Sequence, residues 1–220
     1  MDLSNKSIVM KEKLPVNHFV VVGAWNKAIF SPEWMIENII SEYQNPKIEI
    51  PVGLDSSFKF TTNDFSFVIL GNRLEISSQT LSEESFIKII EIARKVFRLL
   101  PHTPINAIGL NFVFTCNESE LEENFHFSFH DEEALLSNIN KELTAKAIKR
   151  IFKINDKSLL TLSITKTNQI FEFDFNFNYN VSKIEEAIIN IFEDSNEIIK
   201  DKRSKAIEIL NNVYNLTLEV

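Results

Sequence analysis

The stretch FEFDFNFNYN, residues 171–180, decides the fold class. Its odd positions are aromatic and its even positions carry acidic or amide side chains. Because successive side chains of a β-strand point to opposite faces, this alternation predicts a long strand with one face on a core and the other toward water. Polar residues on the wet face cannot be core, so they are available to a partner. The candidate partner-binding residues are therefore Glu172, Asp174, Asn176 and Asn178.

The rest of the chain reads as two halves with the same order of elements, β-α-β-β-β-α. The first half predicts a strand (His18–Trp25), a helix (Pro32–Tyr43), three or four strands (Ile48–Ser78) and a helix (Ser82–Leu100). The second predicts a strand (Ile105–Cys116), a short strand with a helix (Glu132–Leu143), strands (Lys149–Tyr179) and a helix (Ser182–Asn215). We expect an α+β fold, a pseudo-duplication in which both halves form one antiparallel sheet, with helices on one face and a long C-terminal helix.

The predicted boundaries are a flexible N-terminal segment (1–14), a first half (15–103) and a second half (104–220), joined in one continuous domain. The second helix of the first half is expected to begin with a capping box, in which Thr80 is the N-cap and Glu83 stands at N3. The apolar faces of the predicted elements also define a core. We expect Phe173, Phe175, Ile90 and Phe97 to be buried together.

Composition limits the classes of function. The chain has 220 residues, of which 44% are hydrophobic, and a net charge of −8. A negative charge argues against nonspecific nucleic-acid binding, which depends on Lys and Arg. No apolar run approaches the roughly 20 residues that span a bilayer, so we expect no membrane partner. The single cysteine, Cys116, and the lack of a signal-peptide pattern favour the cytoplasm.

Charge is unevenly distributed along the second half. Residues 118–133 contain seven acidic residues and no Lys or Arg, whereas residues 141–157 carry six Lys or Arg against two acids. The two blocks are either solvated faces that balance each other or patches that steer association with a partner. The sequence leaves both interpretations open.

A metal site is the main catalytic alternative. His126 and His130 have the spacing that places two imidazoles on one helix face, beside Asp131. The alternation of Phe and polar residues at 125–130, however, predicts a strand, on which these histidines would be about 13 Å apart. One zinc ion binds imidazole at about 2 Å, so the pair would not share it. The chain also has no glycine-rich phosphate loop and no nucleophile motif. We therefore assign no catalytic residue and no cofactor.

Two resemblances add expectations. The stretch LLPHTPINAIGLNFVF, Leu99–Phe114, resembles the middle of some sporadically distributed, uncharacterised bacterial proteins, and it covers less than a tenth of the chain. It implies a bacterial accessory protein from a mobile-element or defence-related gene neighbourhood. The order of elements resembles the duplicated saddle of the TATA-binding protein. That likeness would imply DNA binding, which the net charge of −8 opposes.

The leading hypothesis is a non-enzymatic protein-binding or assembly subunit that holds a protein partner or a second copy of itself. A fold that looks complete without a chemical motif motivates it. The alternatives are a metal-dependent hydrolase that uses His126, His130 and neighbouring carboxylates, and a nucleic-acid-binding saddle protein.

Overall fold

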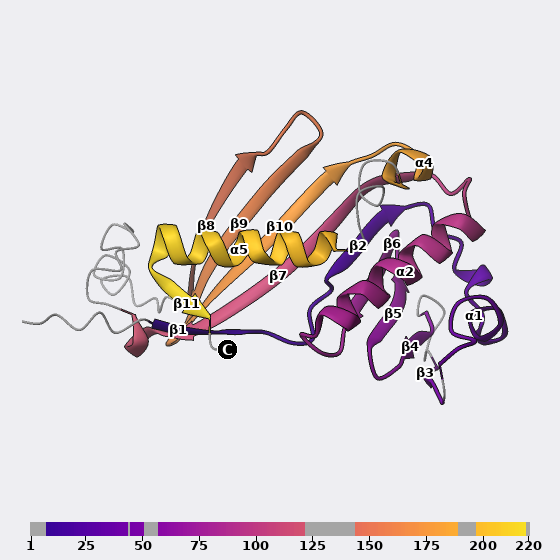
Figure 1. Cartoon of the computed structure of the whole chain (residues 1–220), viewed down its shortest axis with the longest axis horizontal. Helices are drawn as coiled ribbons and strands as arrows, with labels where there is room; N and C mark the ends of the chain where they lie inside the picture. The colour runs from indigo at the N-terminus through magenta and orange to yellow at the C-terminus, as the bar shows by residue number, and fades with distance from the viewer. Residues whose placement is uncertain (1–7, 44, 51–56, 122–143, 189–196, 219–220) are drawn as a thin grey trace, which may run out of the picture.

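A computed structural model describes residues 8–43, 45–50, 57–121, 144–188 and 197–218 (Figure 1). Over these residues the fold is α+β, with a large sheet whose pairs are antiparallel except for β1–β11. The strands are β1 (Ile8–Glu12), β2 (Phe19–Gly23), β3 (Lys47–Glu49), β4 (Lys59–Thr61), β5 (Phe65–Leu70), β6 (Arg73–Ser78), β7 (Ile105–Asn117), β8 (Ala145–Lys153), β9 (Ser158–Thr167), β10 (Ile170–Asn180) and β11 (Leu216–Leu218). The helices are α1 (Pro32–Asn38), α2 (Glu83–Leu99), α4 (Ile184–Ala187) and α5 (Ile198–Tyr214), with 3₁₀ turns η1 (Lys27–Ile29) and η2 (Glu118–Glu120). The predicted fold class is thus confirmed.

The sheet is arranged around the central pair β2–β7. Its order is β3-β4-β5-β6-β2-β7-β10-β9-β8, so the strands that follow each central strand in sequence lie in the same relative order on both sides. The predicted strand at 125–130 and the helix Glu132–Leu143 lie outside the described residues. The likeness between the halves is therefore one of strand order, and an internal duplication stays a prediction.

The N-terminal segment differs from its prediction. We expected residues 1–14 to be flexible, but Ile8–Glu12 form β1, which pairs with β7 on one edge and with β11 on the other. The strand β7 is long enough to hold β1 near its end and β2 near its start on one edge, while β10 runs along the other. The physical reason for the miss is that β1 depends on partners that are distant in sequence.

The core lies between the sheet and the long helices. Both α2 and α5 run across the same face of the sheet (Figure 1). The aromatic row of β10 is buried on this side, where Phe173 meets Tyr214 of α5. The four residues predicted to form the core are completely or almost completely shielded from solvent within one cluster, which confirms that prediction: Phe173, Phe175, Ile90 and Phe97. On the sheet, rings of neighbouring strands meet edge to face, as Phe114 and Phe175 do at 5.9 Å between centroids.

Three predicted helices differ from the structure at their ends, and the first of them, predicted over Pro32–Tyr43, ends at Asn38. The N-cap of α2 is Ser82, whose hydroxyl accepts from the Ser85 N–H at 3.2 Å, so the expected cap at Thr80 is wrong. The Thr80 hydroxyl is instead hydrogen-bonded to the hydroxyl groups of Ser82 and Ser85. The helix expected over Ser182–Asn215 is described as two helices, α4 and α5, and residues 189–196 between them lie outside the described part.

Candidate functional site

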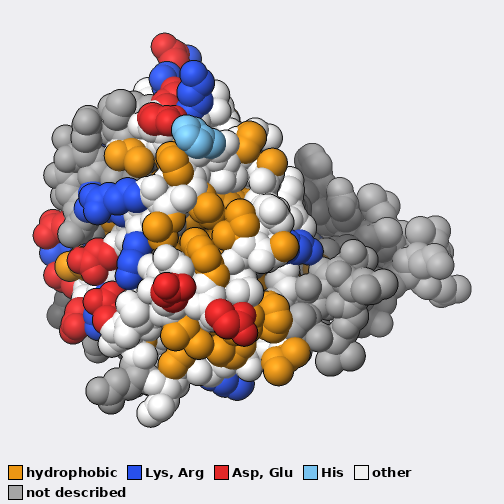
Figure 2. Space-filling view, turned by 90° about the vertical axis from the view of Figure 1, so that its right-hand side faces the viewer, with side chains coloured by type: hydrophobic (Ala, Val, Ile, Leu, Met, Phe, Trp, Pro, Cys, Tyr) orange, Lys and Arg blue, Asp and Glu red, His pale blue; other side chains and the backbone are white. Residues whose placement is uncertain are grey.

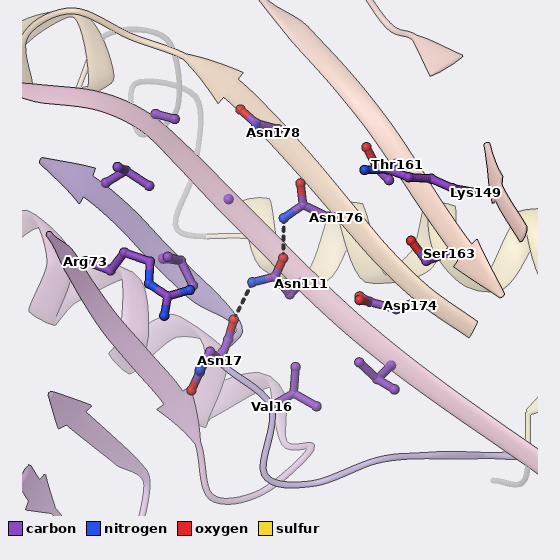
Figure 3. Close-up of a pocket in the computed structure, with 15 residues that line it drawn as sticks. Val16, Asn17, Arg73, Asn111, Lys149, Thr161, Ser163, Asp174, Asn176 and Asn178 are labelled. Carbon is purple, nitrogen blue, oxygen red and sulfur yellow. Dashed lines mark hydrogen bonds between the residues drawn. The ribbon is translucent and has the colours of Figure 1, made fainter. Parts of the chain in front are cut away.

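The polar row of β10 lies on the open face, by which we mean the sheet face opposite α2 and α5. A hollow of about 610 Å³ covers the middle of this face (Figure 3). Three of the four predicted residues line it, namely Asp174, Asn176 and Asn178, while Glu172 lines a smaller hollow of about 420 Å³ nearby. The remaining lining residues come from five other strands and the segment before β2: Val16, Asn17, Val20, Val22, Arg73, Ala107, Gly109, Asn111, Val113, Lys149, Thr161 and Ser163.

A chain of side-chain hydrogen bonds crosses the open face, and we call it the polar chain. The Asn176 amide donates to Asn111 Oδ1, and the Asn111 side-chain amide donates to the backbone carbonyl of Asn17 at 2.7 Å (Figure 3). The Asn17 amide then donates to Glu75 Oε2 at 2.6 Å, and Glu75 Oε1 lies 3.3 Å from Arg73 Nε. The chain links β10, β7 and β6. Because each amide is oriented by its neighbour, the surface is pre-organised.

Glu75 ends the polar chain, and its side chain is almost completely buried. Its side chain is only 5% exposed, whereas its ion-pair partner Arg73 is half exposed at the rim of the hollow. A buried carboxylate needs hydrogen bonds to offset its lost hydration. Glu75 obtains them from Asn17 and Arg73, and Asn17 Oδ1 in turn accepts from Ser77 at 2.6 Å.

Gly109 leaves the centre of the hollow unfilled, because it has no side chain. It lies on β7 between Val20 of β2 and Asn178 of β10. A Cβ atom there would stand 3.0 Å from Asn176 Nδ2, so any larger residue would displace the first amide of the polar chain. The glycine therefore permits both the depth of the hollow and the geometry of the chain.

The carboxyl group of Asp174 lies in an environment that disfavours its ionised form. Burial raises its pKa, the charge of Glu172 raises it further, and Lys13 acts in the opposite direction. Lys13 is already paired with Glu172 at 2.7 Å. Across β9, Asp174 and Lys149 both pair with Ser163. An acid held on an uncovered face at a cost in stability is a feature of binding sites.

An unused acceptor lies in the same row. Asn178 Oδ1 is buried, yet it accepts no hydrogen bond from the described residues. Buried polar atoms are normally satisfied, because a lost bond to water is not otherwise replaced. A donor from a ligand in the hollow would satisfy this oxygen.

The candidate catalytic and metal-binding residues of the sequence are placed as follows. The described residues contain no group of three or more His, Cys, Asp or Glu placed to hold a metal ion. Cys116 is buried on the helix-covered side of β7, and His18 is buried between Phe86 and Phe112. The alternative metal ligands His126, His130 and Asp131 lie outside the described residues.

Burial also determines the chemistry of His18. Its Nδ1 accepts from the Ser78 N–H at 3.2 Å, and its Nε2 is buried without a partner among the described residues. Burial lowers the pKa of His18 to about 4, the Val16 backbone opposes this, and the charge of Arg203 adds to the lowering. The imidazole is therefore neutral near pH 7, and we assign it a structural role.

Sequence reasoning missed three members of the site. Asn17, Glu75 and Asn111 belong to the polar chain but were not among the predicted residues. The signal was present in part, since Asn111 alternates with Leu110 and Phe112 in the predicted strand Ile105–Cys116. The sequence could indicate that Asn111 faces away from the core, but the register that brings it to Asn176 requires the structure.

The end of the molecule formed by the first half is more hydrophobic than the open face (Figure 2). Figure 2 shows hydrophobic side chains gathered on it, with acidic side chains among them and most Lys and Arg side chains beside them. The exposed large apolar residues of α1 and α2 include Ile36 and Leu99. Scattered exposed apolar side chains are normal, and these two do not combine with a hydrogen-bonded surface like that of the open face.

Comparison with known protein-family models gives no match, and no curated protein matches the sequence. Among the described residues, no helix combines the length and apolar character needed to cross a membrane.

Proposed function

We propose that this chain is a non-enzymatic, cytoplasmic binding subunit whose open face holds a polypeptide segment of a protein partner. The observation that carries the proposal is the polar chain from Asn176 to Glu75, a pre-organised set of donors and acceptors on an uncovered sheet face. Ordering side chains costs conformational entropy at the moment of binding. Amides that are already fixed reduce that cost.

The shape of the hollow supports an extended ligand. Its lining comes from one face of the sheet and from the segment before β2, and it reaches from Arg73 on β6 to Lys149 on β8. Pockets for small molecules are concave sites that surround most of the ligand surface. A hollow that lies open along a sheet face and crosses several strands instead suits a polypeptide segment, which can lie across the strands and continue beyond them.

The lining also favours a polypeptide over nucleic acid or sugar. It contains no aromatic residue, because the aromatic side chains of β7 and β10 point to the helices. Single-stranded nucleic acids bind largely by stacking bases on aromatic rings. The charged lining residues are Arg73 and Lys149 against Asp174, which is not the strongly basic surface that phosphates require. Amide, hydroxyl and carboxylate groups instead match peptide groups and polar side chains.

A double charge reversal tests the proposal. Glu172→Arg with Asp174→Arg changes the open face at its most charged point, and the matched control Glu37→Arg with Glu91→Arg reverses two exposed acids on α1 and α2. The reversal at Glu172 removes one exposed ion pair with Lys13, worth about 1 kcal/mol or less. Both variants should therefore melt close to the parent.

Tagged parent and variants are then used to capture proteins from the native host, and bound proteins are quantified by mass spectrometry. The proposal expects one specific protein to be retained by the parent and the control and lost by the open-face variant. Equal retention by all three at physiological salt would place the contact elsewhere. A parent that retains nothing specific, and is monomeric by light scattering, would count against a binding subunit.

A further inference from the structure

The two outer edges of the sheet are built differently. At one edge, β3 has only three residues. Its Glu49 Oε1 lies 3.3 Å from Lys47 Nζ and 3.7 Å from Lys59 Nζ of β4. Short edges with charges of both signs discourage pairing with another strand. At the other edge, β8 has nine residues, AKAIKRIFK, of which four are Lys or Arg and none is acidic. Among the described residues, β8 pairs with β9 alone.

The backbone of β8 presents hydrogen-bonding groups outward at known positions. Just beyond the strand, the Ile154 N–H donates to the Ser158 carbonyl at 3.0 Å, which fixes the phase of bonding between β8 and β9. Bonded and non-bonded pairs alternate in an antiparallel ladder. The even-numbered residues of β8 therefore bond to β9. The odd-numbered residues, including Ile151, direct their N–H and C=O groups to the outer edge.

The side chains of β8 follow a symmetrical pattern. Residues 146–153, KAIKRIFK, read cation, apolar, apolar, cation, cation, apolar, apolar, cation. Each face of the strand therefore alternates cationic and apolar side chains. Two of the apolar residues are well exposed, Ile151 at 60% and Phe152 at 44%. Beside them, the exposed residues Ile154 and Leu159 extend the apolar area to the end of the hairpin.

We propose that the outer edge of β8 binds an extended acidic polypeptide segment by strand addition, with acids opposite its cations and apolar residues opposite Ile151 and Phe152. Strand addition supplies backbone hydrogen bonds, and the cross-strand side chains supply selectivity. Lysines on an edge disfavour a neutral or basic strand, but they favour one whose acids stand at matching positions. Lys153 already pairs with Asp156 at 2.6 Å, an exposed ion pair that exchanges readily.

A second copy of this chain does not fit the edge. Two β8 strands would bring four cations from each copy together without any acid between them, and like charges opposite each other destabilise a pair. The acidic segment is therefore the occupant to which we commit. This edge is distinct from the open face, although Lys149 lines both, so the test leaves Lys149 unchanged.

The test uses a fluorescein-labelled eight-residue peptide that repeats glutamate-valine-valine-glutamate twice. Its anisotropy is followed with the full chain at low salt. Control peptides carry lysine in place of glutamate, or N-methyl groups on alternate amides, which block strand pairing. The acidic peptide should bind, the lysine peptide should not, and N-methylation should weaken binding at least about tenfold, as expected for one or two lost hydrogen bonds.

Two variants locate the site. Ile151→Pro removes an outward N–H while leaving the bonds to β9, and it should weaken binding at least about tenfold, whereas Ile151→Val should not. Lys153→Glu should weaken it severalfold. Absence of binding to the parent, or equal binding of the N-methylated peptide, would overturn the proposal. A parental dimer that Ile151→Pro makes monomeric would assign the edge to a second copy and overturn it too. If Ile151→Pro fails to fold, the N-methylated peptide with the parent still decides.

Discussion

Adjacent residues of β10 differ in what surrounds them. Phe173 is completely buried and meets Tyr214 of α5 edge to face at 5.7 Å between centroids. Asp174 lies on the open face, where burial and the charge of Glu172 disfavour its ionised form. One strand thus carries a face that stabilises the fold and, on the opposite face, an acid whose ionised form weakens it slightly. The difference indicates that selection for stability does not explain Asp174.

The largest expected effect concerns the covered face. Phe173→Ala removes a ring from a closed core, so the free energy of unfolding should fall by roughly 3–5 kcal/mol. Urea denaturation of parent and variant measures this loss. Asn178→Ala, on the open face of the same strand, is the matched control and should cost far less. If Phe173→Ala unfolds like the parent, the covered face is not the source of stability.

The next effect is a pH dependence of the unfolding free energy, and its source is His18, which is buried on the covered side of the sheet. The pKa of His18 is about 4 in the folded protein, whereas the ordinary pKa of a histidine side chain is 6.5. Between these values the unfolded chain binds more protons, so stability falls as pH decreases from 6.5 to about 4. The gap corresponds to roughly 3 kcal/mol, and the loss is complete below the folded pKa.

Unfolding free energies measured across this pH range check the prediction, and His18→Gln provides the control. Burial raises the pKa of Glu12, which makes its own contribution opposite in sign. Because Glu12 is present in both proteins, the difference between parent and variant isolates His18. A difference that does not change with pH would mean that His18 is protonated or exposed.

A smaller loss of unfolding free energy is expected when the polar chain of the open face is broken. Asn111→Ala breaks the polar chain at its middle, since Asn111 accepts from Asn176 and donates to Asn17. Two partly solvated hydrogen bonds should contribute about 1–2 kcal/mol together. Thr161→Ala, nearby in the hollow, is the comparison. Equal unfolding free energies for the two variants would show that the chain does not stabilise the surface.

The smallest effect should have the opposite sign. Asp174→Asn removes the carboxylate whose pKa burial raises, so this variant should be slightly more stable than the parent at neutral pH. The gain should vanish at acid pH, where Asp174 is protonated and uncharged. Thermal melts at both pH values give the comparison. A loss of stability at neutral pH would mean that the carboxylate is compensated in the free protein.

The sequence predicted those features of this contrast that depend on local alternation. The period of two in residues 171–180 identified β10 and the side of each residue, and helical periodicity placed Ile90 and Phe97 in the core. It could not predict the polar chain, because Asn17, Glu75 and Asn111 meet only through the register of separate strands. It also missed β1, whose five residues carry little periodic signal.

The placement of β1 has a consequence for biosynthesis. It pairs in parallel with Leu216–Leu218, so a strand near the start of the chain is completed by a strand near its end. At roughly 5–20 residues per second, synthesis of the intervening chain takes on the order of 10 to 40 s. During that interval the edge of β1 that β11 later covers remains open to other strands. A ribosome that stalls before residue 216 would therefore leave a nascent chain with this edge uncovered, a substrate for chaperones and for aggregation.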